Sequence, residues 1–78
     1  MVTYTRMTGA TLYKRLGEKI ITERKKKKLS QEDLALLSDI DRTYLARIEE
    51  GKANPSLRIL HKIARKLKLQ TYELLTEA

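Results

Sequence analysis

Apolar residues recur at helical spacing along most of the chain, and no segment alternates apolar and polar residues for long enough to predict a strand. Near the start, Leu12, Leu16 and Ile20 recur every four residues, which predicts a helix from about Thr11 to about Lys26. Gly17 lies inside this helix, and we expect it to mark a place where another helix packs closely. Most of the chain is therefore expected to be helical.

The middle of the chain contains start and stop signals for two short helices joined by a tight turn. Ser30 is suited to cap the first helix, and Asp33 three residues later can bond back to complete a capping box. Asp39 falls in the turn, where Asp is among the few residues other than glycine that tolerate a left-handed backbone. Asp41 is the predicted cap of the second helix, which ends at Gly51. Two helices arranged in this way form a helix-turn-helix motif.

The second helix of this motif has an apolar inner face and a polar outer face. Ile40, Leu45 and Ile48 are predicted to face the core. The outer face carries Arg42, Thr43, Tyr44 and Arg47. When such a motif binds DNA, the leading turn of its second helix enters the major groove. These four residues are therefore the candidates for contacts with bases.

Two further helices are predicted after the motif. Pro55 prevents the third helix from continuing into the fourth, and Ser56 is suited to cap the fourth. The predicted inner face of the fourth helix consists of Leu57, Leu60, Ile63, Ala64 and Leu67. A short fifth helix is predicted behind a Thr71 cap. We therefore expect an all-α, five-helix domain at residues 11–78, preceded by a flexible arm at residues 1–10.

The fifth helix is too short to be stable alone, yet it offers Tyr72, Leu74 and Leu75 for packing. A symmetric homodimer through this end, with Tyr72 and Leu75 at the interface, would cover its apolar surface. The alternative is that Leu74 and Leu75 simply close the core of a monomer, and Leu74 is expected to do so.

The charge of the chain favours a polyanionic partner. The 78 residues carry a formal net charge of +7, which suits nucleic acid or an acidic membrane surface. Lysines and arginines without any acidic residue occupy the chain between Glu50 and Glu73. The basic run at residues 24–28 is either a solvated helix end beside the negative pole of the helix dipole or a source of non-specific phosphate attraction.

The sequence offers little for other classes of function. It contains no cysteine, so neither a disulfide framework nor a thiolate metal site is available. No apolar run is long enough to span a bilayer and no signal peptide is recognisable, so we expect a cytoplasmic protein. The single histidine, His61, has no carboxylate or thiol neighbour at catalytic spacing. We therefore expect no enzyme, no cofactor, no metal and no domain that senses a small molecule.

Several separate motifs resemble the lambda/434-repressor-like helix-turn-helix family, also called the Xre family. They are Leu29-Ser-Gln-Glu-Asp-Leu-Ala, then Asp-Arg-Thr-Tyr-Leu, then Ile-Glu-x-Gly and Asn-Pro-Ser-Leu, and they keep the spacing of the family. The resemblance covers about Leu16 to Leu75. Within the family, Ser-Asp-Ile-Asp-Arg-Thr-Tyr-Leu resembles the recognition segment of the controller proteins of restriction–modification systems.

The resemblance implies roles for the outer face of the second motif helix. Arg42 and Thr43 match positions that contact base edges, and Tyr44 matches a position at the boundary between base and phosphate. Arg47 lies one turn further along, where it would contact base or phosphate. The chemistry is suitable, because a guanidinium can donate to both guanine O6 and N7 and a threonine methyl can contact a thymine methyl.

The resemblance also implies backbone contacts and one structural ion pair. Gln31 matches a DNA-backbone contact at the start of the first motif helix, and Lys52 and Asn54 match the loop that grips the phosphate backbone. Arg24 and Glu49 match a pair that forms a buried salt bridge between the first and third helices in the repressor branch of the family.

The chain departs from the family pattern at several positions. Lys28 stands where the family often has glycine, and Asp39 where it often has glycine or asparagine, so both backbone positions are expected to be strained. Glu50 lies near the expected phosphates and cannot attract them. Leu36 and Leu37 stand where the family is usually polar; we expect neighbouring side chains to cover them in part, and the alternative is a second contact with a protein.

Taken together, the sequence predicts a sequence-specific, dimeric regulator of transcription that binds a palindromic operator in double-stranded DNA. The resemblance to controller proteins implies an autoregulatory role in a restriction–modification system. The alternatives are an antitoxin, a phage-type repressor, or a protein-interaction module for which DNA binding is secondary.

Overall fold

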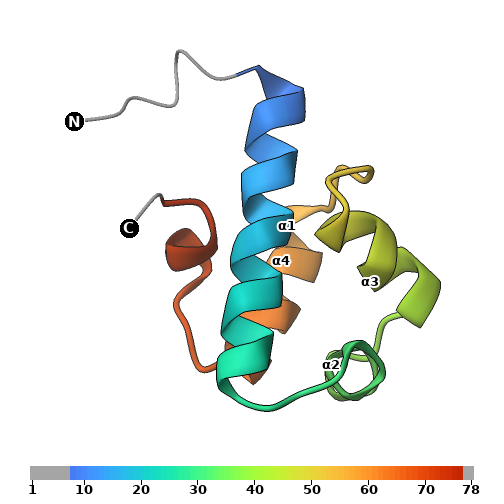
Figure 1. The fold of residues 1–78 in the computed structure, drawn as a ribbon. Helices are drawn as coiled ribbons and strands as arrows, with labels where there is room; N and C mark the ends of the chain where they lie inside the picture. Colours follow the sequence, from blue (N-terminus) through green and yellow to red (C-terminus); the bar gives the residue numbers. More distant parts are fainter. Residues whose placement is uncertain (1–7, 77–78) are drawn as a thin grey trace.

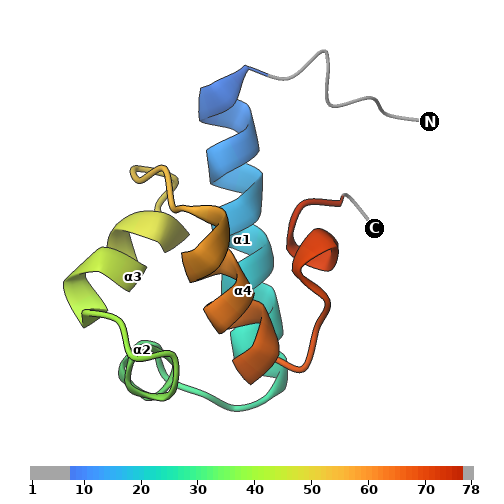
Figure 2. The same cartoon turned by 180° about the vertical axis from the view of Figure 1, so that it is seen from behind.

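The computed structural model describes residues 8–76, and the regular elements in this part of the chain are all helices. Its elements are α1 (Gly9–Lys26), α2 (Gln31–Leu37), α3 (Arg42–Glu49), α4 (Leu57–Lys66) and the 3-10 helix η2 (Thr71–Leu74). Helix α1 runs through the middle of the molecule, with α2 and α3 on one side and η2 on the other, as Figure 1 and the reverse view in Figure 2 show.

Helix α1 begins earlier than the sequence predicts. The Thr8 hydroxyl accepts the N–H of Thr11 at 3.1 Å and caps the helix, so Gly9 and Ala10 belong to its first turn. The predicted flexible arm at residues 1–10 was therefore too long at its inner end, and its first seven residues lie outside the described part of the chain.

The core draws on every one of these elements. Its buried apolar residues are Leu16, Ile20, Leu34, Ala35, Leu45, Ile48, Leu60, Ile63, Ala64, Leu67 and Leu74. Helix α1 contacts α3 and η2, and α4 contacts α2 and η2. The core therefore fixes α2 and α3 against the rest of the domain.

The prediction of five α-helices was wrong for the last element. Residues Thr71–Leu74 form a single 3-10 turn of four residues, because this segment is too short to gain the repeated backbone bonds of an α-helix. Thr71 does not cap the turn: Gln70 is the cap residue and makes no side-chain bond there, and the Thr71 hydroxyl lies 3.1 Å from Nδ1 of His61. Leu74 is buried as predicted, and Leu75 packs half-buried against the core.

The predicted inner face of α4 was wrong at one residue. Leu57 is 68% exposed, whereas the other four apolar residues predicted for that face are buried. Leu57 is the first residue of α4, directly after the Ser56 cap, and so lies one turn before the part of the helix that reaches the core. The Ser56 hydroxyl accepts the N–H of Ile59 at 3.2 Å, as the sequence predicts.

The backbones of α1 and α3 approach closely at Gly17. A Cβ at this position would lie 2.6 Å from the carbonyl oxygen of Ile48 and 2.7 Å from the carbonyl carbon of Glu49. Any side chain would therefore push α3 away from α1. This confirms the close packing predicted for Gly17.

All four α-helices end with the same hydrogen-bond arrangement. After each helix, one residue has a positive φ: Lys28 (58°), Asp39 (55°), Gly51 (76°) and Lys68 (60°). The N–H groups of this residue and of the next one return to carbonyls in the last turn, which is the Schellman motif. The strain predicted for Lys28 and Asp39 is present, and Lys68 shares it although a lysine gives no sequence signal for such a backbone.

Candidate nucleic-acid interface

The first turn of α3 presents polar side chains to solvent. Arg42 and Thr43 are exposed, whereas Tyr44 is half-buried and packs against the core. Arg42 and Thr43 line a shallow hollow of about 270 Å³ together with Gln31 and Ala46. Asp41 is the cap residue of α3, as predicted, but its side chain makes no capping hydrogen bond. The first N–H groups of α3 therefore receive no side-chain cap from Asp41, next to the exposed Arg42 and Thr43.

A buried ion pair connects α1 to the end of α3. Arg24 donates through Nε to Oε2 of Glu49 at 2.8 Å and through Nη2 to Oε1 at 3.0 Å. The third guanidinium nitrogen of Arg24, Nη1, donates to the carbonyl oxygen of Leu29 at 3.1 Å. The side chains of Arg24 and Glu49 are only 12% and 4% exposed. The structure therefore brings together the pair that the family resemblance implies, although Arg24 stands within a run of basic residues in the sequence.

Gln31 extends this ion pair to the exposed arginine of α3. Its Nε2 donates to Oε1 of Glu49 at 3.0 Å, and its Oε1 accepts from Nε of Arg42 at 3.4 Å. One amide thus bridges a buried carboxylate and an exposed guanidinium. The sequence did not indicate this role, because nothing in the spacing shows how α2 and α3 face each other.

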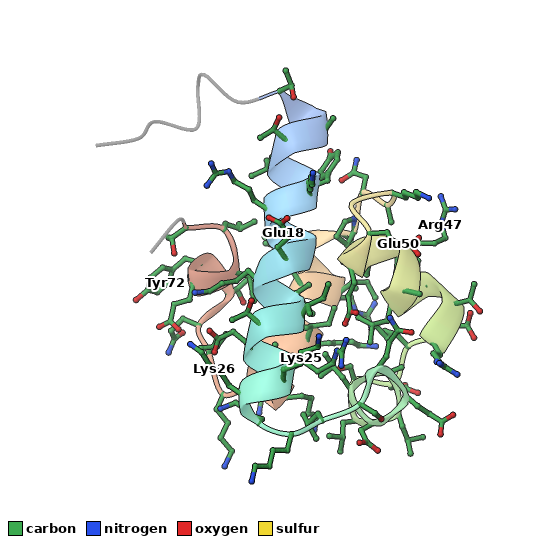
Figure 3. All side chains as sticks on the ribbon, viewed as in Figure 1. Glu18, Lys25, Lys26, Arg47, Glu50 and Tyr72 are labelled. Atoms are coloured by element: carbon green, nitrogen blue, oxygen red, sulfur yellow. The ribbon has the colours of Figure 1, made fainter. Side chains whose placement is uncertain are left out.

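Arg47 and Lys52 meet where α3 turns into the loop before α4. The Arg47 Nη2 donates to the carbonyl oxygen of Lys52 at 2.9 Å. The ammonium group of Lys52 lies 3.9 Å from Oε1 of Glu50, and both of these side chains are largely exposed. Asn54 is exposed in the same loop. Figure 3 shows Arg47 and Glu50 extending together from the same end of α3.

The outer face of α2 is more apolar than expected. Leu36 is 80% exposed, so the expectation of cover by neighbouring side chains was wrong for this residue. Leu37 is 48% exposed and is partly covered. Tyr72 is also exposed, and Figure 3 places it on the side of α1 away from α3.

Other kinds of site find little support in residues 8–76. This part of the chain contains no group of three or more potential metal ligands. His61 is exposed, and its one side-chain hydrogen bond in this part of the chain is with Thr71. No described helix is both long and apolar enough to cross a membrane.

These features define a helix-turn-helix domain, in which α2 supports α3 and α3 exposes its first turn. A helix-turn-helix family model matches residues 20–74, and the chain belongs to this family. The Xre-type resemblance and the all-helical fold are therefore confirmed.

Two relatives are informative. The control protein C.MunI of Mycoplasma sp is 45% identical over 64 residues, which cover 81% of this chain and 86% of that protein. The immunity repressor protein of Bacillus phage phi105 is 39% identical over 62 residues, covering 80% of this chain but 43% of that protein. Both names denote regulators, which is consistent with the expectation that the chain is not an enzyme.

A solved structure of a controller protein has a similar fold. The restriction-modification controller protein C.AhdI from Aeromonas hydrophila has a TM-score of 0.77 and 39% sequence identity. The match covers 80% of this chain and 94% of that one. The chain is thus a helix-turn-helix regulator that closely resembles restriction–modification controller proteins.

Proposed function

We propose that this protein is a dimeric, sequence-specific DNA-binding regulator. It would control the expression of a restriction–modification system and also its own expression. The observation that carries the proposal is the exposed first turn of α3. There Arg42 is hydrogen-bonded to Gln31, which is bonded to Glu49 of the buried Arg24–Glu49 pair. A pre-positioned guanidinium loses less entropy when it binds a base.

Base recognition is assigned to Arg42, Thr43 and Tyr44. Arg42 offers a bidentate contact to guanine, which gives roughly 1–3 kcal/mol of discrimination against other bases. Thr43 is exposed beside it for contact with a thymine methyl. Tyr44 is anchored in the core by its ring, so only its outer edge is available at the boundary between base and phosphate.

Contacts with the DNA backbone are assigned to Gln31, Lys52 and Asn54. Gln31 uses one amide proton for Glu49 and its oxygen for Arg42, which leaves a second amide proton for a phosphate. Lys52 and Asn54 project from the loop after α3, where an ammonium and an amide can both donate to phosphate oxygens.

The dimer is assigned to the end of the chain that carries Tyr72 and Leu75. A two-fold axis there would place two recognition helices about one DNA turn apart, roughly 34 Å, and would require a palindromic operator. Occupancy of that operator would then rise steeply with protein concentration, because dimer formation and DNA binding are coupled. A cytoplasmic regulator of this kind needs neither a cofactor nor a small-molecule ligand.

The test is a comparison of two substitutions on two kinds of DNA. An operator is first selected from random-sequence duplexes, and binding to the selected and random duplexes is measured over a range of salt concentrations. Arg42→Ala is expected to lose the preference for the selected duplex. Lys52→Ala is expected to weaken both duplexes about equally and to reduce the salt slope by about one unit. An equal loss on both duplexes for Arg42→Ala would contradict the role assigned to that residue.

A protein-interaction module is the second candidate, and the exposure of Leu36 favours it. The same selection distinguishes the two functions. A regulator keeps a sequence preference at salt concentrations that screen the phosphate contacts, whereas a module with secondary DNA binding shows none.

A further inference from the structure

Three of the four helix ends are closed by an apolar side chain, and the end of α3 is not. In the Schellman motif, the residue after the left-handed one usually makes an apolar contact back to the helix. After α1, α2 and α4 this residue is Leu29, Ile40 and Leu69, and all three pack against the core. After α3 the corresponding residue is Lys52, whose side chain is 69% exposed.

Arg47 closes the end of α3 by a polar contact instead. The N–H of Lys52 donates to the carbonyl oxygen of Arg47 at 2.8 Å, and Nη2 of Arg47 donates to the carbonyl oxygen of Lys52 at 2.9 Å. The same two residues are therefore joined in both directions, once through the backbone and once through the guanidinium.

The path of this turn is also fixed from the side of α1. Gly51 has a φ of 76°, and a Cβ on it would lie 2.9 Å from Cα of Lys14. The turn thus rests on the backbone of α1 and cannot move inward. Arg47 holds the carbonyl of Lys52 from the outside, so the backbone of Lys52 is restrained. Its side chain stays exposed, with the ammonium group 3.9 Å from the exposed carboxylate of Glu50.

We infer that Arg47 is a positioning residue for the phosphate-binding loop and does not itself contact bases. It acts on DNA through Lys52, by holding the backbone from which the ammonium group projects. If an apolar residue at position 52 closed the end of α3, its side chain would point into the core. Because Arg47 closes this end by a hydrogen bond instead, position 52 can carry an exposed cation. This inference rests on the proposed function, because the loop is assigned to the DNA backbone.

The test separates the hydrogen bond of Arg47 from its charge. Chemical synthesis of the chain allows Arg47→citrulline, which keeps the Nη2 donor and removes the charge, beside Arg47→Met, which removes both. Arg47→Met is expected to weaken random and selected duplexes by the same factor and to reduce the salt slope by about one unit, as Lys52→Ala does. Arg47→citrulline is expected to keep the slope of the parent. Adding Arg47→Met to Lys52→Ala is expected to reduce the slope no further.

Each alternative role gives a different result. Loss of slope with citrulline would show a direct phosphate contact, and loss of preference for the selected duplex with Met would show base recognition; either result overturns the inference. Unchanged DNA binding in Arg47→Met, with only a lower unfolding temperature, would also overturn it. Arg65→Met, which removes an exposed charge from the last turn of α4, is the matched control and is expected to leave the slope unchanged.

The proposed function can fail independently of this inference. In that case the parent protein shows no preference for any selected duplex, while the salt slopes on random duplex still decide how Arg47 acts.

Discussion

At the scale of single residues, the carboxylate of Glu49 connects α3 to both α1 and α2. Its carboxylate accepts two bonds from Arg24 and one from Gln31, and Gln31 in turn accepts from Arg42. The family resemblance implied the Arg24–Glu49 pair, which the structure contains. It could not predict the bonds of Gln31, because these depend on the angle between α2 and α3, which no local sequence pattern encodes.

Removal of Glu49 is expected to destabilise the domain strongly. Glu49→Ala leaves the buried guanidinium of Arg24 without its counter-charge, and breaking a buried pair in this way typically costs roughly 3–5 kcal/mol. The free energy of unfolding from denaturant titration measures the effect. Glu50→Ala is the control, because that side chain is 57% exposed and its contact with Lys52 is long, so a change near zero is expected. The same unfolding midpoint for Glu49→Ala and the parent would contradict the structural role of the pair.

At the scale of the elements, some helix starts and ends were predictable from the local sequence and others were not. Ser30 and Ser56 cap α2 and α4 as the sequence predicts, because a hydroxyl and an N–H three residues later meet through local geometry alone. Asp41 occupies the predicted cap position without making the bond, and Lys68 takes a left-handed backbone that lysine does not signal. The local sequence did not indicate either of these two outcomes.

The capping box of α2 is expected to contribute to the acid sensitivity of the fold. The backbone N–H and the hydroxyl of Ser30 lower the pKa of Asp33 below its ordinary value of 3.8. Because the folded-state pKa is the lower one, this stabilisation is complete above pH 3.8 and is lost as the pH falls through the folded-state value. Asp33→Asn is therefore expected to lose less stability than the parent below about pH 4.

Unfolding free energies measured between neutral pH and pH 3 test this expectation. Asp41→Asn is the matched control, because Asp41 makes no capping bond at the start of α3. If Asp33→Asn and the parent lose the same unfolding free energy between neutral pH and pH 3, the capping carboxylate does not contribute to the acid sensitivity.

At the scale of the whole molecule, exposed apolar residues are what the sequence could not place. Leu57 was predicted to be on the inner face of its helix and Leu36 to be partly covered, yet both are largely exposed. Periodicity shows which residues share a face of a helix, but not which part of that face the remaining elements cover. Tyr72 lies on the side of α1 away from α3 (Figure 3), so the proposed dimer contact would leave the proposed DNA-binding face uncovered.

The proposed dimer is expected to depend on Tyr72. Tyr72→Ala removes an exposed aromatic ring and is expected to shift dissociation of the dimer to higher protein concentration, because less apolar surface is buried between subunits. Light scattering over a dilution series measures this shift. Leu36→Ala, which removes a comparably exposed side chain from α2, is expected to leave the dissociation unchanged. A parent protein that is monomeric at high micromolar concentration would contradict the dimer.

The close packing of α3 against α1 affects how the DNA sequence preference of such a protein could be changed. Since Gly17 lets the carbonyls of Ile48 and Glu49 rest directly against α1, the packing of α3 depends on a residue outside the proposed DNA-binding face. If α3 binds DNA as proposed, its exposed side chains can be exchanged without moving the helix, whereas a methyl group at position 17 would displace the whole helix. Under the proposed function, operator preference can vary on this scaffold only while position 17 remains glycine.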